Sequence, residues 1–131
     1  MDTKGEVKKY VNQSLHYLKN ASESIDAGNS DKAGEFLWGS MAEALKAVAA
    51  SREIVLKNHR QIWNYTETLT KELGDKSIYD AFIHANYLHT NFYESELELR
   101  DIRRAAEDIR MAVEKLLRLA AEEKERRIGY G

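Results

Sequence analysis

Residues 32–56 read KAGEFLWGSMAEALKAVAASREIVL, and this stretch decides the fold. It contains no proline, and its apolar side chains recur every three or four residues, which predicts a helix with two apolar sides. Such a helix has partners on both sides, so we expect it to be central and its small residues to let neighbours approach closely. One side carries Leu37, Met41, Ala44, Leu45, Val48 and Val55, and the other carries Phe36, Gly39, Ala47, Ala50 and Ile54.

Four further helices are predicted from the same periodicity. Gly28 and Gly74 each follow a predicted helix, at the position where left-handed backbone often ends one. Asp75 or Ser77 is then placed to cap the helix that begins after Gly74. The four helices span about residues 3–27, 62–73, 78–93 and 95–127.

These helices predict an all-α fold. Short connections favour antiparallel neighbours, so we expect an up-down antiparallel bundle of about five helices, four long and one short. The length of 131 residues fits a single helical-bundle domain, residues 1–131, with a frayed tail at residues 122–131. There is no membrane span, no secretory signal and no cysteine, so we expect a cytoplasmic protein without disulfides. The formal net charge of −2 argues against a general duplex-DNA binder.

Residues 81–95, AFIHANYLHTNFYES, combine four aromatic side chains with two of the four histidines. On a helix, His84 and His89 point in different directions and cannot bind one metal ion together. Asp80 lies four residues before His84 and is placed to orient its ring. The first interpretation is a structural role for both histidines, and the alternatives are a ligand site or a subunit contact formed by this region. The candidate residues of this region are Asp80, His84, Tyr87, His89, Asn91 and Tyr93.

Arg52 is a charged residue on an apolar side of the helix predicted for residues 32–56. In that position it needs an oppositely charged partner or contact with water. The interpretations are a buried or interfacial ion pair, a side chain that reaches out to solvent, and a functional cation. His59 follows seven residues later and shares this side if the helix continues through both residues. No metal-binding or cofactor-binding motif occurs, so we predict neither a metal nor a cofactor.

Two segments resemble the archaeal PaREP family of paralogous proteins. The first is ASESIDAGNSDKAGEFLWGSMAEALKAVAA, residues 21–50, and the second is the stretch at residues 81–95. The order of these features is similar to that family. A helix is followed by a glycine-containing turn, an alanine-rich helix, the signature L-H-x-N-F-Y-E and a last helix. The signature residues are Leu88, His89, Asn91, Phe92, Tyr93 and Glu94.

The resemblance implies a small helical bundle that is distantly similar to HEPN domains, the nucleotide-binding helical domains of higher eukaryotes and prokaryotes. HEPN ribonucleases use an arginine followed, after four to six residues, by a histidine, often assembled across a dimer interface. Arg52 and His59 have this spacing. In such an enzyme Arg52 would stabilise the charge that develops on the phosphate, and His59 would act as general acid or base.

Three functions follow from these observations. We favour a non-enzymatic interaction protein that forms a homo-oligomer, with a dimer as the first expectation. The central helix has two apolar sides, and the helices carry more tyrosine- and tryptophan-bearing faces than one bundle core needs. The alternative is a HEPN-like, metal-independent RNA nuclease or nucleotide-binding protein that uses Arg52 and His59. The third is a small-ligand site lined by the aromatic residues of 81–95.

Overall fold

The computed structural model describes the backbone of residues 3–90 and 99–130, and the side chains of residues 5–90 and 99–126. Five α-helices follow one another in this part of the chain, which confirms the all-helical bundle. Their bounds are α1 Thr3–Asp26, α2 Ser30–Ser51, α3 His59–Leu73, α4 Lys76–Thr90 and α5 Leu99–Tyr130. Residues 122–130, for which we expected a frayed tail, continue α5. No helix of the described part is both long and apolar enough to span a bilayer.

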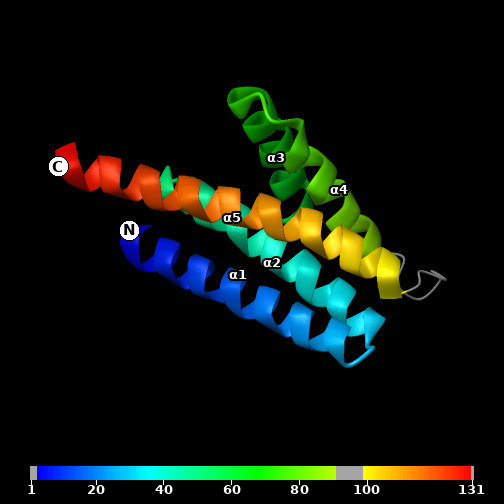
Figure 1. Cartoon of the computed structure of the whole chain (residues 1–131). Helices are drawn as coiled ribbons and strands as arrows, with labels where there is room; N and C mark the ends of the chain where they lie inside the picture. Colours follow the sequence, from blue (N-terminus) through cyan, green and yellow to red (C-terminus); the bar gives the residue numbers. More distant parts are fainter. Residues whose placement is uncertain (1–2, 91–98, 131) are drawn as a thin grey trace.

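The central helix is α2, as its two apolar sides predicted. It contacts all four of the other helices, and α1 and α5 lie alongside it (Figure 1). Its buried side chains form the middle of the hydrophobic core, where Leu37, Met41 and Leu45 are almost completely shielded from solvent. Both apolar sides of α2 are therefore covered within a single chain.

The contact between α1 and α2 is close because small residues meet there. Ser14 and Ser40 are fully buried, and each hydroxyl donates to the backbone carbonyl of the other residue, at 2.8 and 2.9 Å. Nearby, a Cβ atom on Gly39 would lie only 3.0 Å from the ring of Tyr17. The absence of a side chain at Gly39 therefore allows the tyrosine to lie directly on α2.

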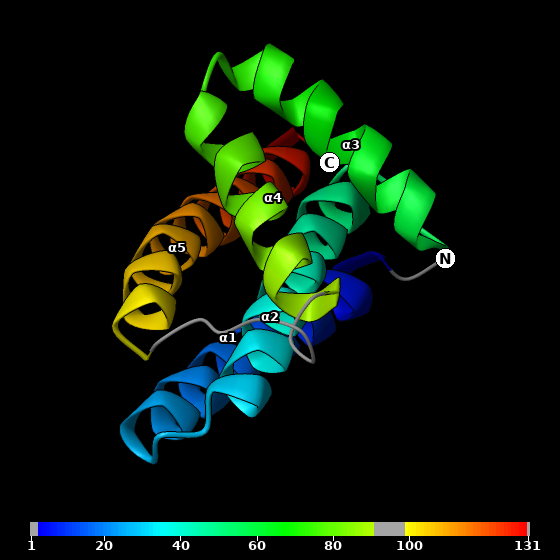
Figure 2. The same ribbon diagram turned by 90° about the vertical axis from the view of Figure 1, so that its right-hand side faces the viewer.

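The direction of α5 departs from the strict up-down alternation that we expected. Arg103, near the beginning of α5, lies 3.9 Å from Asp26 at the end of α1. Glu123, far along α5, pairs with Arg52 at the end of α2, so α5 runs parallel to α2. The reason is the α3–α4 hairpin, whose helix α4 packs against both α2 and α5 (Figure 2). It returns the chain to Gly34, where a Cβ atom would lie 3.3 Å from the carbonyl oxygen of Leu88.

The end of α2 was predicted five residues too late. The helix ends at Ser51 because Glu53 adopts left-handed backbone, with φ at 61°. The amide of Ile54 then donates to the carbonyl of Ala49 at 2.8 Å, which closes the last turn. After this turn, Asn58 caps α3 by accepting a hydrogen bond from the amide of Gln61 at 2.9 Å.

The other two predicted helix ends are confirmed. Gly28 and Gly74 have φ angles of 75° and 61°. Asp75 accepts hydrogen bonds from the backbone amide of Ser77 at 3.0 Å and from the ammonium of Lys115 at 2.9 Å. Asp75 also accepts a hydrogen bond from the hydroxyl of Ser77 at 2.5 Å. The hydroxyl of Ser77, followed by Lys115, holds the pKa of Asp75 below its ordinary value.

Gly74→Ala tests the backbone requirement at the α3–α4 turn. An added Cβ atom would meet nothing within 4 Å, so the change acts only through the left-handed backbone. We expect the free energy of unfolding in urea to fall by about 1 kcal/mol. Gly74→Asn should lose less, because asparagine tolerates this backbone conformation better. Equal losses for the two variants would contradict this explanation.

Candidate functional site

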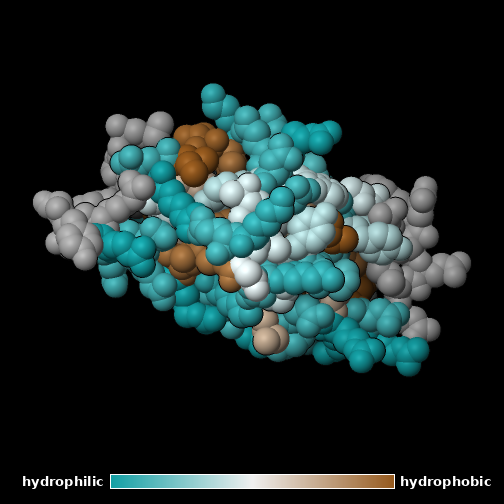
Figure 3. Space-filling model, turned by 90° about the horizontal axis from the view of Figure 1, so that it is seen from above, coloured by the Kyte–Doolittle hydropathy of each residue, from teal (hydrophilic) through white to brown (hydrophobic). Residues whose placement is uncertain are grey.

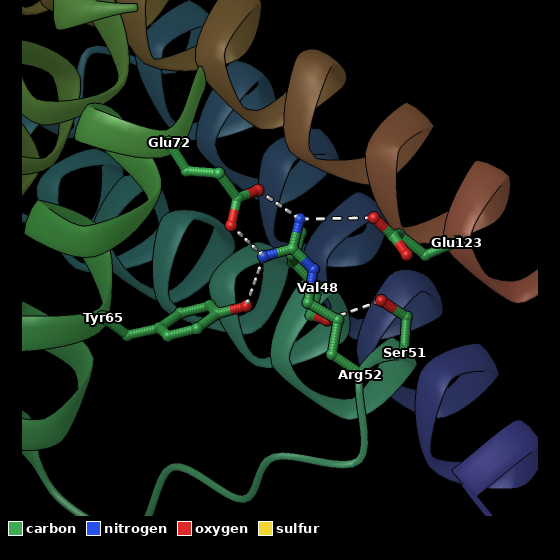
Figure 4. Close-up of polar contacts among 6 residues, drawn as sticks. All are labelled: Val48, Ser51, Arg52, Tyr65, Glu72 and Glu123. Carbon is green, nitrogen blue, oxygen red and sulfur yellow. Dashed lines mark hydrogen bonds and ion pairs between the residues drawn. The ribbon is translucent and has the colours of Figure 1, made fainter. Parts of the chain in front are cut away.

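Arg52 lies where three helices meet, at the C-terminal cap of α2 (Figure 4). Its guanidinium forms a two-pronged contact with Glu72 of α3, with N–O distances of 3.0 and 2.6 Å. The same group donates to Glu123 of α5 at 3.3 Å and to the hydroxyl of Tyr65 of α3 at 3.4 Å. Its side chain is only 17% exposed. We call Arg52, Tyr65, Glu72 and Glu123 the arginine clasp.

The charges of the arginine clasp are coupled. Burial alone would lower the pKa of Arg52, but the hydrogen bond to Glu72 and the surrounding charges outweigh it, so the pKa lies above its ordinary value. For Tyr65 burial acts in the other direction and raises the pKa, against the opposing effect of Arg52. The phenol therefore stays neutral at physiological pH and accepts a hydrogen bond from the cation. This arrangement joins three helices and keeps the guanidinium engaged with carboxylates.

His59 begins α3 and belongs to an aromatic cluster that lies apart from the clasp. Its ring centroid is 5.1 Å from that of Trp38 and 6.0 Å from that of Trp63. Phe82 completes the cluster, with its ring perpendicular to that of Trp63. His59 is exposed and therefore remains accessible from solvent.

The structure does not bring Arg52 and His59 into contact. Because α2 ends at Ser51, the two residues do not share a helix face, and the chain turns between them. Arg52 bonds to Tyr65, Glu72 and Glu123, whereas among the described residues His59 makes its ring contacts with the aromatic cluster. Any joint action of the two residues would require Arg52 to leave its carboxylate partners or a second chain to supply one of the pair.

The candidate residues around α4 divide between two places. Asp80 and His84 line a groove of about 290 Å³ between α4 and α5, together with Asp108 and Lys115. His89 instead stacks on Trp38, with centroids 5.2 Å apart and planes 18° apart. The predicted divergence of the two histidines is thus observed.

The remaining α4 candidates are less informative. Tyr87 of α4 is 49% exposed, whereas the candidates Asn91 and Tyr93 follow α4 in the sequence and lie outside the described residues. Within the described part of the chain, no set of three metal-ligating side chains comes together.

A larger groove, of about 660 Å³, lies between α1 and α5. Its apolar lining includes Leu18, Ile25 and Leu37, and also Leu15, whose side chain is 47% exposed. Charged residues of both signs surround this apolar surface, namely Lys19, Asp26, Arg103, Glu107 and Arg110. We call it the α1–α5 groove.

Sequence reasoning missed the partners of both candidate residues. The apolar position of Arg52 showed that it needed an anion, but Glu72 and Glu123 come from helices whose placement the sequence does not reveal. Trp38 was visible as a large aromatic on α2, beside its buried stripe. Its contacts with His59 and His89 depend on how the α3–α4 hairpin folds over α2.

The clasp can be tested with a double-mutant cycle on Arg52→Met and Glu72→Gln. Glu72 is 46% exposed, so solvent screens the pair, and we expect a coupling energy of about 1 kcal/mol in urea unfolding. The exposed pair Lys19 and Glu23, 4.0 Å apart, is the matched control and should show a smaller coupling. A coupling no larger than that of the control would mean that the clasp does not stabilise the fold.

Residues 9–113 match the model of the archaeal PaREP1/PaREP8 family. The fold is similar to that of a crystal structure of a protein from Sulfolobus solfataricus, with a TM-score of 0.70 and 20% sequence identity over 85% of this chain and 95% of that chain. At that identity the likeness shows the fold alone. No curated protein matches the sequence. The family match covers most of the helical bundle, and the chain therefore belongs to the archaeal PaREP1/PaREP8 family.

Proposed function

We propose that this protein is a non-enzymatic interaction module that forms a homodimer through the α1–α5 groove. The observation that carries the proposal is Leu15, a large apolar side chain left 47% exposed at an apolar groove. An apolar centre with a polar rim is the usual anatomy of a protein interface. The occupant that we infer is a second copy of the same chain.

Charge supports a second copy as the occupant. In a two-fold symmetric contact each surface meets itself, so acidic groups must be matched by basic groups on the same surface. The rim meets this condition on both helices, with Lys19 and Asp26 on α1 and with Arg103 and Glu107 on α5. A rim of a single sign would instead repel its own copy.

The face formed by α3 and α4 is a weaker candidate for this contact. Seen from above, it is mainly hydrophilic, with apolar side chains in separate patches (Figure 3). The two apolar sides of α2, which first pointed to oligomerisation, are already covered by α1, α4 and α5. The dimer proposal therefore rests on the α1–α5 groove and not on α2.

Leu15→Glu tests the proposed interface. We expect the wild-type protein to have the mass of a dimer in size-exclusion chromatography with light scattering at about 100 μM, and the variant to be a monomer, because a carboxylate would be desolvated in the contact. Met111→Glu is the matched control, since Met111 is 50% exposed but lines no part of the α1–α5 groove. It should leave the dimer intact. A wild-type monomer at this concentration would refute the proposal.

The alternative function, a HEPN-like nuclease that uses Arg52 and His59, has less support. The guanidinium that would stabilise phosphate is held by Glu72 and Glu123, and the histidine that would transfer a proton packs on Trp38. A dimer in which Arg52 of one chain meets His59 of the other is the arrangement that this alternative needs.

Incubation of the purified protein with mixed RNA distinguishes the two functions. We expect no cleavage by the wild-type protein in the presence of EDTA. Cleavage that disappears in both Arg52→Ala and His59→Ala, and persists in the control variant His84→Ala, would instead establish the nuclease.

A further inference from the structure

The groove between α4 and α5 is small. Its volume of about 290 Å³ lies just below the range of roughly 300–1,000 Å³ that small-molecule sites occupy. Ala81 of α4 and Ala112 of α5 line it and are almost fully buried, so they form its floor. Because these side chains are short, space for a side chain of another molecule remains between the helices. We call it the α4–α5 groove, and it shares no lining residue with the α1–α5 groove.

Exposed apolar surface lies at and beside the α4–α5 groove. Met111 of α5 lines the groove and is 50% exposed. Tyr87 is 49% exposed and follows the lining residue His84 by three positions, so both lie on the same side of α4. Methionine and tyrosine are enriched in protein interfaces. A surface that continues past so small a groove suits a polypeptide better than a small molecule.

Two carboxylates of the α4–α5 groove have no partner. Asp80 of α4 and Asp108 of α5 line it, and neither side chain forms an ion pair or a hydrogen bond with the described part of the chain. In particular, Asp80 does not bond to His84, although from the sequence we expected it to orient that ring. Lys76 and Arg104 precede these aspartates by four residues but do not pair with them, and this order gives the weaker helical ion pairs.

The lysine of the groove does not balance these two carboxylates. The ammonium of Lys115 lies 2.9 Å from Oδ2 of Asp75 and 3.4 Å from the hydroxyl of Ser77. Because Asp75 is not a lining residue, the charge of Lys115 is neutralised from outside the groove. Asp80 and Asp108 therefore give the α4–α5 groove a net negative charge, to which a cationic occupant is complementary.

We propose that the α4–α5 groove is a docking site for an arginine side chain in a basic segment of a partner protein. A guanidinium has five N–H donors in a flat fork, enough for the carboxylates of Asp80 and Asp108 together. The apolar stem of the arginine lies against Ala81, Ala112 and Met111. Arginine is among the side chains that most often anchor protein interfaces. The proposal does not depend on the dimer, which uses a different groove.

The methyl signal of Met111 reports on the groove in NMR titrations of the full chain with ¹³C-labelled methionine methyl groups. Met41, which is fully buried in the core, supplies the reference signal. One probe is a blocked tripeptide with arginine between two leucines, and the other carries citrulline, which has nearly the same shape and no charge. We expect the arginine peptide to shift the Met111 signal at about 1 mM and the citrulline peptide to leave it in place. Equal shifts, or none with about 10 mM arginine peptide, would overturn the proposal.

Asp80→Asn and Asp108→Asn test the two carboxylates. Each asparagine keeps the size of the side chain and removes its charge, so we expect each to weaken binding of the arginine peptide about tenfold. Asp101→Asn is the matched control, because this exposed aspartate lies on α5 and does not line the groove. It should leave the affinity unchanged. Equal losses in all three variants would mean that the peptide responds to net charge alone, and would contradict the site.

Two further measurements identify the occupant. Butylguanidine carries the same cation on a short stem without a peptide, so it lacks the leucines that reach Tyr87 and Met111. We expect it to bind several-fold more weakly than the arginine peptide. Tighter binding of butylguanidine would assign the groove to a free amine and contradict a protein partner. In light scattering, Asp80→Asn should have the same mass as the wild-type protein. A change of mass would assign the groove to a contact between copies of this chain and likewise overturn the proposal.

Discussion

The whole structure depends on the close packing of α2 against its neighbours. A helix enclosed by four others has little room for large side chains all around, so its alanines, serines and glycines decide how near each neighbour comes. At Ser40 the approach is close enough for hydroxyl groups of α1 and α2 to bond to each other's backbone. At Gly34 it brings the backbone of α4 against α2. The large residues Leu37, Met41 and Leu45 then fill the spaces between these contacts.

The arginine clasp completes this packing at one end of α2. A helix ends with carbonyl groups that have no partner within the helix, and a positive charge there is favourable. Arg52 provides that charge and at the same time attracts Glu72 of α3 and Glu123 of α5. The Arg52 side chain thus connects the α3–α4 hairpin to α2 and α5. This role explains an arginine on an otherwise apolar side of the chain without any reference to catalysis.

The helices themselves could be predicted from the sequence, because the lack of proline and the regular apolar spacing are local properties. The end of α2 could not, since the left-handed residue there is Glu53 and not glycine, and Ile54 and Val55 continue the apolar pattern. That error placed Arg52 and His59 on one helix. The clasp and the aromatic cluster lay beyond prediction for a different reason. Each joins residues from separate helices, whose relative positions depend on the fold of the hairpin.

The parallel course of α2 and α5 has a consequence for the order in which the protein matures. A growing chain that has completed α1 to α4 still lacks the helix that covers the remaining apolar surface of α2. The buried residues of α5 extend from Ile102 to Ala120, so that surface stays open until α5 has been synthesised. During this interval the nascent protein exposes an apolar surface of α2, to which chaperones or other nascent chains bind.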